Sequence, residues 1–364
     1  MKSLQLALNS RIESNNNRKL RMAQTGSYEV PSTIRMWQYN STGGIEHSLT
    51  LNDKAQPPKT PRYASTQVTI QVLAASLNPI DFKIPELPLI GPYLARSFTT
   101  PGLDFSGRVV SAGSDLPQGT LVAGRLAGPG PYGSLSSYLV APRSGLAKLS
   151  DKISPEDGAS LGTAGQTAYQ SIVPYVKRGD KVFINGGSGG VGTFAVQIAK
   201  IIGCHVTTSC SSGNVQLVKD LGADEVIDYK TQDLVTELKR NGLVYDHVFD
   251  TVGQPGSLLK DSEGFLKPEG KFIQVGGGMN FESITSMLYK LLVPTFLGGA
   301  NRSFKFLACM NNPTDMEQLA AWVAEGKLKI IIDSVYPYEE AARAFEKLKT
   351  GRARGKVIVA PISS

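Results

Sequence analysis

The chain has 364 residues, of which 41% are hydrophobic and 19% charged, and its formal net charge is +7 at pH 7. This composition is typical of a globular protein of about two domains, and three cysteines exclude a disulfide framework and a four-cysteine zinc site. No apolar run approaches the roughly 20 residues that cross a bilayer, and the basic balance fits a nucleotide, a nucleic acid or an anionic membrane surface.

The first 27 residues differ from the rest of the chain. They hold five basic residues, one acidic residue (Glu13) and a run of Asn and Ser residues. A basic, acid-poor segment is typical of a mitochondrial transit peptide, and it also suits a disordered tail that precedes a second start at Met22. We therefore expect a tail or targeting segment over residues 1–27. The protein is then cytoplasmic or, through this segment, mitochondrial.

The next part of the chain, up to about residue 153, is predicted to be β-rich. Residues 66–77 alternate and are rich in β-branched side chains, and residues 107–114 and 119–126 resemble short strands bounded by glycine turns. Strands at such short spacing favour a Greek-key, barrel-like domain. Residues 85–105 are rich in proline and show no helical period, which predicts a loop over a site.

From Ser154 onward, short apolar strands alternate with segments of helical length. Pro155 and the acids after it indicate a helix start, and the strand and helix patterns then repeat as far as Gly277. This rhythm predicts βαβ units and a parallel sheet with helices on both faces. After Asp315 the pattern is helix, strand, helix, strand.

A glycine-rich turn follows the first of these strands. Residues 187–192 satisfy the pattern G-x-G-x-x-G, and apolar residues at helical spacing follow from Ala195 to Ile202. Glycines allow a tight turn, close approach of the backbone to a pyrophosphate, and close packing of helix on sheet. The N-terminus of the helix then presents free N–H groups to the phosphates. The pattern predicts dinucleotide binding.

The end of the second strand distinguishes between coenzymes. NAD-binding proteins usually carry an acid there for the ribose 2′-hydroxyl. No acid occurs between Cys204 and Lys219, and the same stretch holds Ser211, Ser212 and Asn214. Small hydroxyls with a nearby cation suit a 2′-phosphate, which favours NADPH over NADH. Lys219 taken singly also fits a solvated helix face.

Seven sequence blocks, in this order, are similar to those of one enzyme family. They are SLNPIDFK (76–83), PGLDFSGRVVSAGS (101–114), GTAGQTAYQ (162–170), GGSGGVGTFAVQIAK (186–200), LGADEVIDY (221–229), DTVG (250–253) and RGKVIV (354–359). On these blocks the chain resembles the medium-chain dehydrogenase/reductase superfamily, most closely its zinc-free quinone oxidoreductase (zeta-crystallin-like) branch. The resemblance covers about Thr33 to Pro361.

This resemblance implies a two-domain α/β fold. A Rossmann domain with a doubly wound parallel sheet, residues 154–309, would be inserted in a GroES-like β-rich catalytic domain. That catalytic domain would comprise residues 28–153 and 310–364. The active site would lie in the cleft between the two domains.

The resemblance also implies which residues hold a nicotinamide coenzyme. Asn78 and Asp81 would line the nicotinamide side of the cleft, and Thr167 would lie near the carboxamide. The remaining residues would be Ser188, Gly189, Gly190 and Val191 at the pyrophosphate, Ser211, Ser212, Asn214 and Tyr229 at the 2′-phosphate, Val275, Gly276 and Gly277 beside the nicotinamide, and Lys356 from the C-terminal strand.

Trans-acting enoyl reductases of fungal polyketide pathways are also similar to the chain. The shared features are the NPxDxK block, the CSxxN block and the DY pair. Lys83 matches a lysine that is thought to lie at the active site of those enzymes. We take Lys83, Asn78 and Tyr93 as the candidate catalytic residues.

Zinc-dependent members of the superfamily differ from the chain at their metal site. They carry a cysteine where this chain has the segment NPID, and a Gly-His-Glu motif that is absent here. His47, His205 and His247 lie at no zinc-binding spacing, and Cys204 and Cys210 do not complete a ligand set. We expect no metal, and therefore an acceptor that is already electron-poor.

The expected reaction is hydride transfer from NADPH to a carbon conjugated to a carbonyl group. Lys83, a backbone N–H or the nicotinamide ribose would stabilise the oxygen, and Lys83, Tyr93 or water would supply the proton. A biosynthetic enzyme of changed chemistry, such as a cyclase or dehydratase, and a non-catalytic NADPH-sensing or RNA-binding protein remain alternatives. Basic residues do not cluster with aromatic residues along most of the chain, so nucleic-acid binding is disfavoured.

The residues after Gly278 are apolar with helical spacing, like a pocket wall for a small hydrophobic substrate. The same pattern suits a contact between two copies of the chain. A monomer and a homodimer are both compatible with it.

Overall fold

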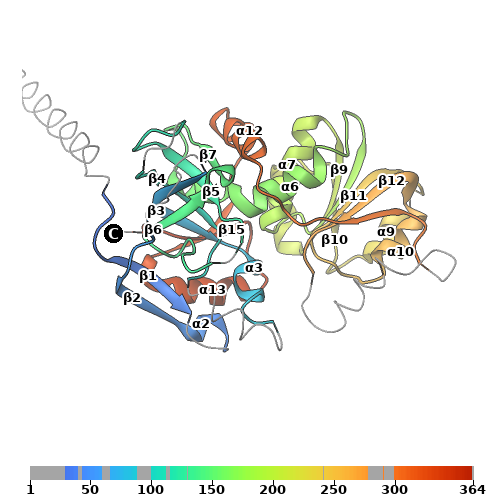
Figure 1. Ribbon diagram of the computed structural model, residues 1–364. Coiled ribbons are helices and arrows are strands. Elements are labelled where there is room, and N and C mark those ends of the chain that lie inside the picture. The colour runs from blue at the N-terminus through green and yellow to red at the C-terminus, as the bar shows by residue number, and fades with distance from the viewer. Residues whose placement is uncertain are drawn as a thin grey trace, which may run out of the picture.

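The computed structural model describes residues 29–39, 43–59, 66–87, 100–111, 115–128, 130–240, 242–277, 290 and 299–362. They form two lobes that lie side by side (Figure 1), each built on its own β-sheet. The predicted tail of residues 1–27, Tyr93 and most of the proline-rich loop lie outside the described residues. No helix among the residues described is long and apolar enough to cross a bilayer.

In the first lobe, the described residues form a sheet whose seven strands come from both ends of the chain. In spatial order they are β14 (Ile332–Tyr336), β15 (Lys356–Val359), β3 (Gln67–Leu77), β4 (Asp104–Val109), β5 (Leu121–Arg125) and β7 (Leu146–Lys148), with β6 (Tyr138–Pro142) paired to β3. The alternating segment predicted at residues 66–77 is β3, and its pairing with β4, β6 and β15 makes it the centre of the sheet. Ile358 of β15 lies opposite Ser76, so the C-terminal segment completes an N-terminal sheet.

A small hairpin lies beside this sheet. It consists of β1 (Ile34–Tyr39) and β2 (Leu49–Ala55), joined through the short helix α2 (Ile45–Ser48). Trp37 donates from Nε1 to the carbonyl oxygen of Tyr338 at 2.8 Å, so the hairpin is held to the C-terminal part of the same lobe.

The second lobe is the predicted parallel sheet. Its order is β10 (Glu225–Asp228), β9 (His205–Cys210), β8 (Lys181–Asn185), β11 (Tyr245–Asp250), β12 (Leu266–Gln274) and β13 (Ser303–Phe306). The chain enters at β8, winds outward through β9 and β10, and then returns to β11 on the other side. This reversal is the mark of a doubly wound sheet, so the predicted fold class is confirmed. The predicted domain boundaries near 153 and 309 fall between β7 and the next helix, and after β13.

Helices flank both sheets. They are α3 (Pro79–Lys83), α5 (Pro155–Ala159), α6 (Gln166–Ile172), α7 (Gly190–Ile202), α8 (Val215–Asp220), α9 (Leu234–Lys239), α10 (Leu258–Asp261), α12 (Pro313–Ala324) and α13 (Ala341–Lys349). The start of α5 follows from local chemistry, because Ser154 accepts the N–H of Asp157 at 3.1 Å and Pro155 needs no acceptor. Between α5 and α6 the chain makes a π-helical turn, η2 (Leu161–Gly165).

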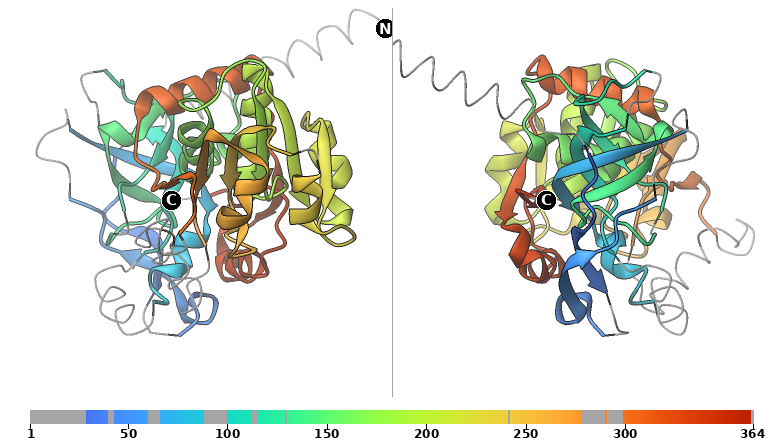
Figure 2. Two further views of the ribbon diagram at one scale, coloured as in Figure 1. Left: turned by 90° about the vertical axis from the view of Figure 1, so that its right-hand side faces the viewer. Right: turned by 60° about the vertical axis from the view of Figure 1, so that its left-hand side comes forward.

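One hydrophobic cluster extends through both lobes. It joins Ala123 and Ala147 of the first sheet with Ile184, Phe194 and Leu319 of β8, α7 and α12. Figure 1 and the left view of Figure 2 show α12 along the top of the molecule, where it spans the junction. Because such contacts are packed at interior density, the lobes are held together along this side.

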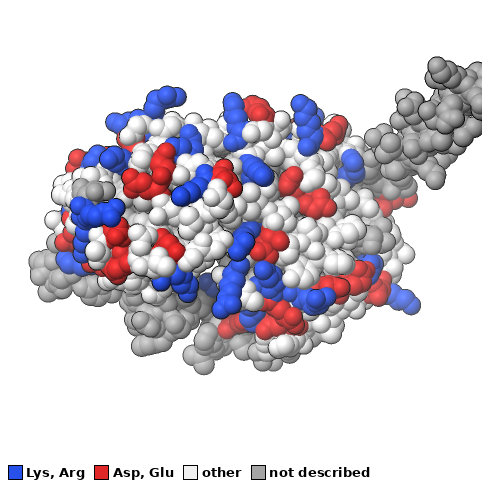
Figure 3. Space-filling view, turned by 180° about the vertical axis from the view of Figure 1, so that it is seen from behind, with Lys and Arg blue, Asp and Glu red and all other residues white. Residues whose placement is uncertain are grey.

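Charged side chains are mixed on the face of the molecule shown in Figure 3. Lysine and arginine side chains alternate with acidic ones over both lobes. Elsewhere among the described residues many charged side chains are paired, for example Lys200 with Asp224 at 2.8 Å and Lys267 with Asp246 at 2.6 Å. The net positive charge of the chain is therefore not gathered into one patch on this face.

Candidate functional site

A cleft of about 1210 Å³ lies where the two lobes meet. On the parallel sheet it lies beyond the carboxyl ends of β8, β9 and β11, where Asn185, Cys210 and Thr251 line it. Doubly wound sheets bind ligands at this edge, at the point where the direction of winding reverses. The opposite wall comes from residues 77–79 and 351–356 of the first lobe.

The predicted glycine-rich turn forms part of the cleft wall. A Cβ at Gly192 would overlap the carbonyl oxygen of Gly186 and lie 2.7 Å from Cα of Gly187, so this position requires glycine for packing. A Cβ at Gly189, in contrast, would meet only one atom, the oxygen of Gly186, at 3.6 Å. Gly189 therefore keeps open space in the cleft in front of α7. The first N–H groups of a helix have no acceptor within the helix, so this end of α7 favours an anion.

A polar cluster lies next to this turn. Asn214 donates from Nδ2 to Ser188 Oγ at 3.0 Å and to Ser211 Oγ at 3.2 Å. Oδ1 of Asn214 is buried without a hydrogen-bond partner among the described residues. A buried acceptor that lacks a donor is costly, so this cluster suits a ligand that brings its own donors. All three side chains line the cleft, and all three belong to residues predicted to bind the coenzyme: Ser188, Ser211 and Asn214.

The sequence reasoning missed Arg354 at this end of the cleft. Arg354 lines the cleft, and a Cβ at Gly213 would lie 3.3 Å from its Nη2 atom, so the guanidinium lies against the chain beside Ser211. Its backbone N–H donates to Asp333 at 2.8 Å, which holds the segment in place. Tyr229 lines the same end, with the ammonium of Lys230 5.6 Å from the centre of its ring. This arginine belongs to the sequence block RGKVIV. The sequence could not show that it lies beside Gly213, because the two residues are distant in the chain and meet only in the folded protein.

Two predicted residues of this group do not line the cleft. Lys219 is exposed on α8. Ser212 is exposed, and its hydroxyl hydrogen-bonds the carboxylate of Asp228, which lowers the pKa of that carboxyl. Their roles in coenzyme binding remain predictions.

Asn78 lines the cleft from the first lobe, but both ends of its amide are engaged by the protein. Nδ2 donates to Asp104 Oδ2 at 2.8 Å, and Oδ1 accepts from Nζ of Lys356 at 2.6 Å. Asp104 in turn accepts from the N–H of Thr163 at 2.7 Å and from its hydroxyl at 2.7 Å. Asp104 belongs to β4 and Thr163 to η2, so this buried carboxylate joins the first sheet to the segment that leads into the parallel sheet.

Arg125 extends this cluster. It donates from Nε to the hydroxyl of Thr163 at 3.1 Å and from Nη1 to Oδ1 of Asn311 at 2.5 Å. Asn311 lies between β13 and α12, where the chain returns from the second lobe to the first. Together these residues form a buried polar cluster at the boundary between the lobes: Asn78, Asp104, Thr163, Arg125 and Lys356.

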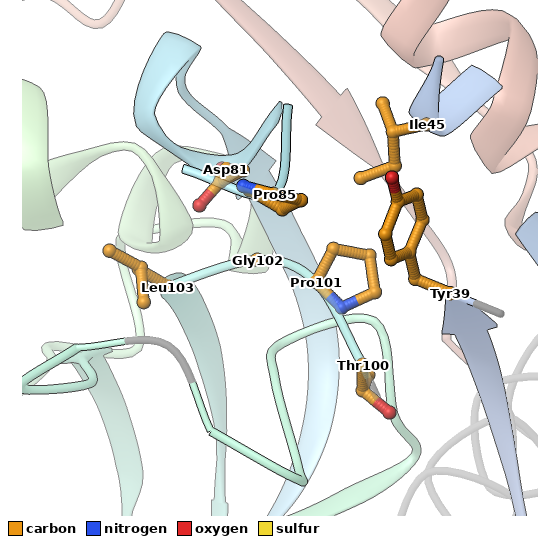
Figure 4. Close-up of a pocket in the computed structure, with 8 residues that line it drawn as sticks. All are labelled: Tyr39, Ile45, Asp81, Pro85, Thr100, Pro101, Gly102 and Leu103. Atoms are coloured by element: carbon orange, nitrogen blue, oxygen red, sulfur yellow. The ribbon is translucent and has the colours of Figure 1, made fainter. Parts of the chain in front are cut away.

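Asp81 lies behind Asn78 and does not line the cleft. Its Oδ2 accepts the N–H of Asn78 at 2.7 Å, and its Oδ1 is buried without a partner among the described residues. Burial, with the nearby charge of Asp104, raises its pKa from 3.8 to about 7. Figure 4 shows Asp81 beside Pro85 at a small cavity of about 20 Å³, which is large enough for one water molecule. Asp81 is thus placed to orient the start of α3.

Lys83 reaches across to the second lobe. Its Nζ donates to the carbonyl oxygen of Gly277 at 2.6 Å, just after β12, and burial lowers its pKa. Lys290, which sequence reasoning missed, approaches the same strand end by donating to Oε1 of Gln274 at 3.1 Å, and burial lowers its pKa also. Two partly desolvated amines therefore lie at the segment 275–277, which was predicted to pass the nicotinamide. None of these residues lines the cleft of 1210 Å³.

Thr167 is buried on α6 and likewise does not line the cleft. Its hydroxyl hydrogen-bonds the thiol of Cys309, whose pKa is raised by burial. Cys309 is a third residue near a predicted site, after Arg354 and Lys290, that the sequence analysis did not single out.

Metal-binding side chains do not gather in the part of the chain that the structure describes. No group of three or more His, Cys, Asp or Glu residues is placed there to hold an ion. Cys204 and Cys210 are buried, and burial raises the pKa of each thiol to about 11, which disfavours the thiolate that binds zinc. The donor set of the described residues does not fit a zinc site.

Comparison with known proteins connects this geometry to a family. A model described as an alcohol dehydrogenase GroES-like domain matches residues 64–151, and one described as a zinc-binding dehydrogenase matches residues 221–359. A trans-enoyl reductase of Aspergillus terreus is 44% identical over 345 residues, which cover 91% of this chain and 97% of the relative. A chloroplast envelope quinone oxidoreductase homolog of Arabidopsis thaliana is 34% identical and covers 89% and 97%.

A solved structure has the same fold. The quinone oxidoreductase of Coxiella burnetii aligns with a TM-score of 0.74 at 32% identity, over 90% of this chain and 99% of that one. A match of this length includes both lobes.

Proposed function

We propose that this chain, which belongs to the medium-chain dehydrogenase/reductase superfamily and to its quinone oxidoreductase and enoyl reductase branch, reduces an activated carbon–carbon double bond or a quinone with NADPH. One observation carries the proposal. The cleft combines an open phosphate-binding turn on one lobe with a buried polar cluster on the other. This arrangement suits a coenzyme that spans both lobes.

The family implies a nicotinamide coenzyme, and the residues present fit one. Gly189 leaves room for a diphosphate, and the N-terminus of α7 offers N–H donors. Oδ1 of Asn214, which has no partner among the described residues, would accept a hydrogen bond from a ribose hydroxyl. We assign Ser188, Gly189, Gly190 and Val191 to the diphosphate and Asn214 to the adenosine ribose.

The choice of NADPH rests on the charge at the adenosine end. Arg354 and Lys230 line the cleft there, beside the hydroxyl of Ser211, and β9 ends without an acid. Two acids lie near this end. Asp228 on β10 does not line the cleft, and its carboxylate accepts from Ser212 and from the N–H of Lys230 at 3.0 Å. Asp233 lines the cleft, and its carboxylate accepts the N–H of Thr236 at 2.8 Å at the start of α9. Arginine forms strong, charge-assisted hydrogen bonds with phosphate, so this end favours a 2′-phosphate over a free 2′-hydroxyl.

When bound, a nicotinamide supplies a hydride. We assign Lys83 to the substrate oxygen, because its amine is partly desolvated and lies at residues 275–277. To contact the substrate, Nζ of Lys83 exchanges its hydrogen bond to the carbonyl oxygen of Gly277 for one to the substrate oxygen. An N–H donor at the oxygen of a conjugated carbonyl stabilises the negative charge that develops there, by about 3–4 kcal/mol in comparable sites. Nζ of Lys83 then passes its proton to the reduced substrate and regains one from water. Tyr93, outside the described residues, stays a predicted alternative donor.

The substrate class is a small hydrophobic acceptor whose double bond is conjugated to a carbonyl. The test is the absorbance of NADPH mixed with the purified protein and 9,10-phenanthrenequinone, 2-enals or enoyl thioesters. We expect oxidation of NADPH with at least one of these acceptors. Binding of NADPH without oxidation by any acceptor would contradict reduction as the native chemistry.

A pair of variants tests the role of Lys83. Lys83→Met should lower kcat about 100-fold and leave the Kd for NADPH nearly unchanged, because the lost donor acts on the substrate. Lys152→Met, at an exposed lysine, is the matched control. An equal loss in both variants, or an unchanged kcat in Lys83→Met, would remove Lys83 from the mechanism.

A further inference from the structure

Lys356 is a buried lysine at the boundary between the lobes. Only 3% of its surface is exposed, although lysine is rarely buried without a specific partner. Its Nζ donates to Oδ1 of Asn78 at 2.6 Å and to the carbonyl oxygen of Leu77 at 3.1 Å. The ammonium therefore binds the end of β3 and the first residue before α3.

The aliphatic part of the same side chain lies against the phosphate-binding turn. A Cβ at Gly190 would be 3.4 Å from Cδ of Lys356 and 3.3 Å from the carbonyl oxygen of Gly355. The backbone of Gly355 also donates to the carbonyl oxygen of Ser188 at 3.1 Å. One side chain thus touches the turn on the second lobe with its stem and Asn78 on the first lobe with its head.

The charges around Lys356 explain why the ammonium stays buried. Burial lowers the pKa of Lys356, and the charges of Asp104 and Asp81 oppose this shift by favouring the protonated form. Asp104 reaches the ammonium only through the amide of Asn78, which donates to Asp104 and accepts from Lys356. The orientation of the Asn78 amide is therefore set from both sides. In the reversed orientation, Oδ1 would face the carboxylate of Asp104 and Nδ2 would face the ammonium of Lys356, and neither pair can form a hydrogen bond.

We propose that Lys356 is a positioning residue that acts through Asn78 and does not bind the coenzyme with its ammonium. It holds the Asn78 side chain and the start of α3 at a fixed position relative to the phosphate-binding turn. The inference rests on the proposed function, because Asn78 lines the cleft in which reduction would occur. It differs from the sequence expectation, in which Lys356 reaches the coenzyme from the C-terminal strand.

A double-mutant cycle tests this inference by kinetics. Lys356→Met keeps a long unbranched side chain against Gly190 and removes the ammonium, and Asn78→Ala removes the amide. We expect each variant to lower kcat about 10- to 100-fold with less than about threefold change in the Kd for NADPH. Because both act through one contact, the double variant should fall no further than the worse single variant, within about threefold.

Two outcomes of the cycle would overturn the inference. Losses that multiply in the double variant would mean that Lys356 acts independently of Asn78. A Lys356→Met protein that keeps its kcat but binds NADPH at least about 10-fold more weakly would mean that the ammonium contacts the coenzyme. If Lys356→Met does not fold, Lys356→Gln, which keeps a shorter N–H donor, takes its place in the same cycle.

Hydrogen–deuterium exchange gives a readout that needs no turnover. The N–H of Asn78 is bonded to Asp81, and the N–H of Asp81 to the carbonyl oxygen of Asn78 at 3.0 Å, so exchange over residues 76–84 reports this region. Lys356→Met should speed exchange there, and Lys327→Met, at an exposed lysine paired with Glu325, should not. Unchanged exchange in Lys356→Met would overturn the inference.

The two proposals fail in different ways. A wild-type protein that oxidises no NADPH with any acceptor would contradict the proposed function, and the exchange pattern would still decide whether Lys356 holds Asn78 in place. An active wild type with a multiplicative cycle would contradict only the role of Lys356.

Discussion

Gly355 donates its backbone N–H to the carbonyl oxygen of Ser188 at 3.1 Å, and the same glycine forms an isolated parallel bridge with Gly189. Gly355 lies immediately before β15, the last strand of the first lobe, and Ser188 lies in the glycine-rich turn of the second. The backbone of the first lobe thus contacts the glycine-rich turn directly. Changes near Gly355 should therefore alter coenzyme binding as well as stability.

The first prediction concerns Gly355 itself. Its φ is +88°, and a Cβ there would overlap the carbonyl oxygen of Ile331 and lie 2.8 Å from its carbon. Gly355→Ala should destabilise the protein by roughly 2–4 kcal/mol and weaken NADPH binding, measured by thermal unfolding and titration. Gly351→Ala is the control, because its φ is +64° but a Cβ there meets nothing within 4 Å. Equal effects of the two changes would contradict the argument.

The second prediction concerns the choice of coenzyme. Arg354→Ala removes the guanidinium beside Gly213 and should raise the Kd for NADPH about 10- to 100-fold, because a charge-assisted contact to phosphate is lost. The Kd for NADH should change little, since NADH lacks the 2′-phosphate. Arg343→Ala, at an exposed arginine paired with Glu340, should leave both values unchanged. An equal rise in the Kd for NADPH and for NADH would mean that Arg354 contacts a part of the coenzyme other than the 2′-phosphate.

Two glycines of the phosphate-binding turn should respond differently to the same added methyl group. Gly192→Ala forces a Cβ into Gly186 and Gly187, and should lower the thermal stability strongly or prevent folding. Gly189→Ala adds a Cβ in open space at a φ of −80°, so the protein should fold normally. The methyl group would then occupy space assigned to the diphosphate, and NADPH titration should show a loss of affinity. An unchanged affinity of Gly189→Ala for NADPH would contradict the assignment of this turn to the diphosphate.

The fourth prediction is a pH dependence of stability that arises from His247. This side chain is fully buried on β11, and burial lowers its pKa from 6.5 to about 4, while Ser171 accepts a hydrogen bond from Nε2 at 2.9 Å. Between these values the unfolded chain binds the proton more readily than the folded one. Stability from this group is therefore full above pH 6.5 and decreases toward pH 4, by up to about 3 kcal/mol.

The measurement for His247 is the free energy of unfolding in denaturant at pH 7 and pH 5. The loss on acidification should be smaller in His247→Gln than in the wild type. His205→Gln, at a partly exposed histidine beside Asp224 and Glu225, is the control. An identical pH dependence in wild type and His247→Gln would refute the assignment.

The fifth prediction is that Asp81 changes the pH dependence of stability in the direction opposite to His247. Its pKa is about 7 in the folded protein and 3.8 for the free group, so the folded state binds the proton more readily across this range. The stabilisation from the protonated group is complete below pH 3.8 and is lost as the pH rises through 7, by up to about 4 kcal/mol. Asp81→Asn should therefore gain stability relative to wild type between pH 5 and pH 8, again by denaturant unfolding. A gain that does not grow with pH would contradict the raised pKa.

The elements of the second lobe were predictable because their determinants are local. The G-x-G-x-x-G pattern needs only neighbouring residues to form a turn, and Gly192 and Gly187 pack within that turn. The alternation of short apolar strands with helical segments likewise encodes a parallel sheet without any long-range information. The central strand β3 was predictable from its alternation, but its partners β15 and β4 were not.

The candidate site was predictable only in part. Ser188, Ser211, Asn214 and Tyr229 line the cleft as expected, since they follow strand ends of one sheet. The predicted residues Asp81, Lys83, Thr167 and Lys219 lie off its wall. Lys83 and Thr167 bond to the remote residues Gly277 and Cys309. Asp81 bonds to the nearby backbone of Asn78, and Lys219 is exposed on α8. Arg354 and Lys290 were missed in the sequence analysis because each contacts a residue that is distant in the sequence, Gly213 and Gln274 respectively.

The sequence by itself determined the strand β3, the alternation of strands and helices in the second lobe, the glycine-rich turn and the family, all of which follow from patterns within short segments. Only the tertiary structure decided that the ammonium of Lys356 is directed to Asn78 and the guanidinium of Arg354 to Gly213. For Lys356, which is buried, the physical reason is that a polar group takes its direction from the partners that compensate its desolvation. Arg354 is exposed, and its guanidinium lies beside Gly213 because these two parts of the chain meet only on folding.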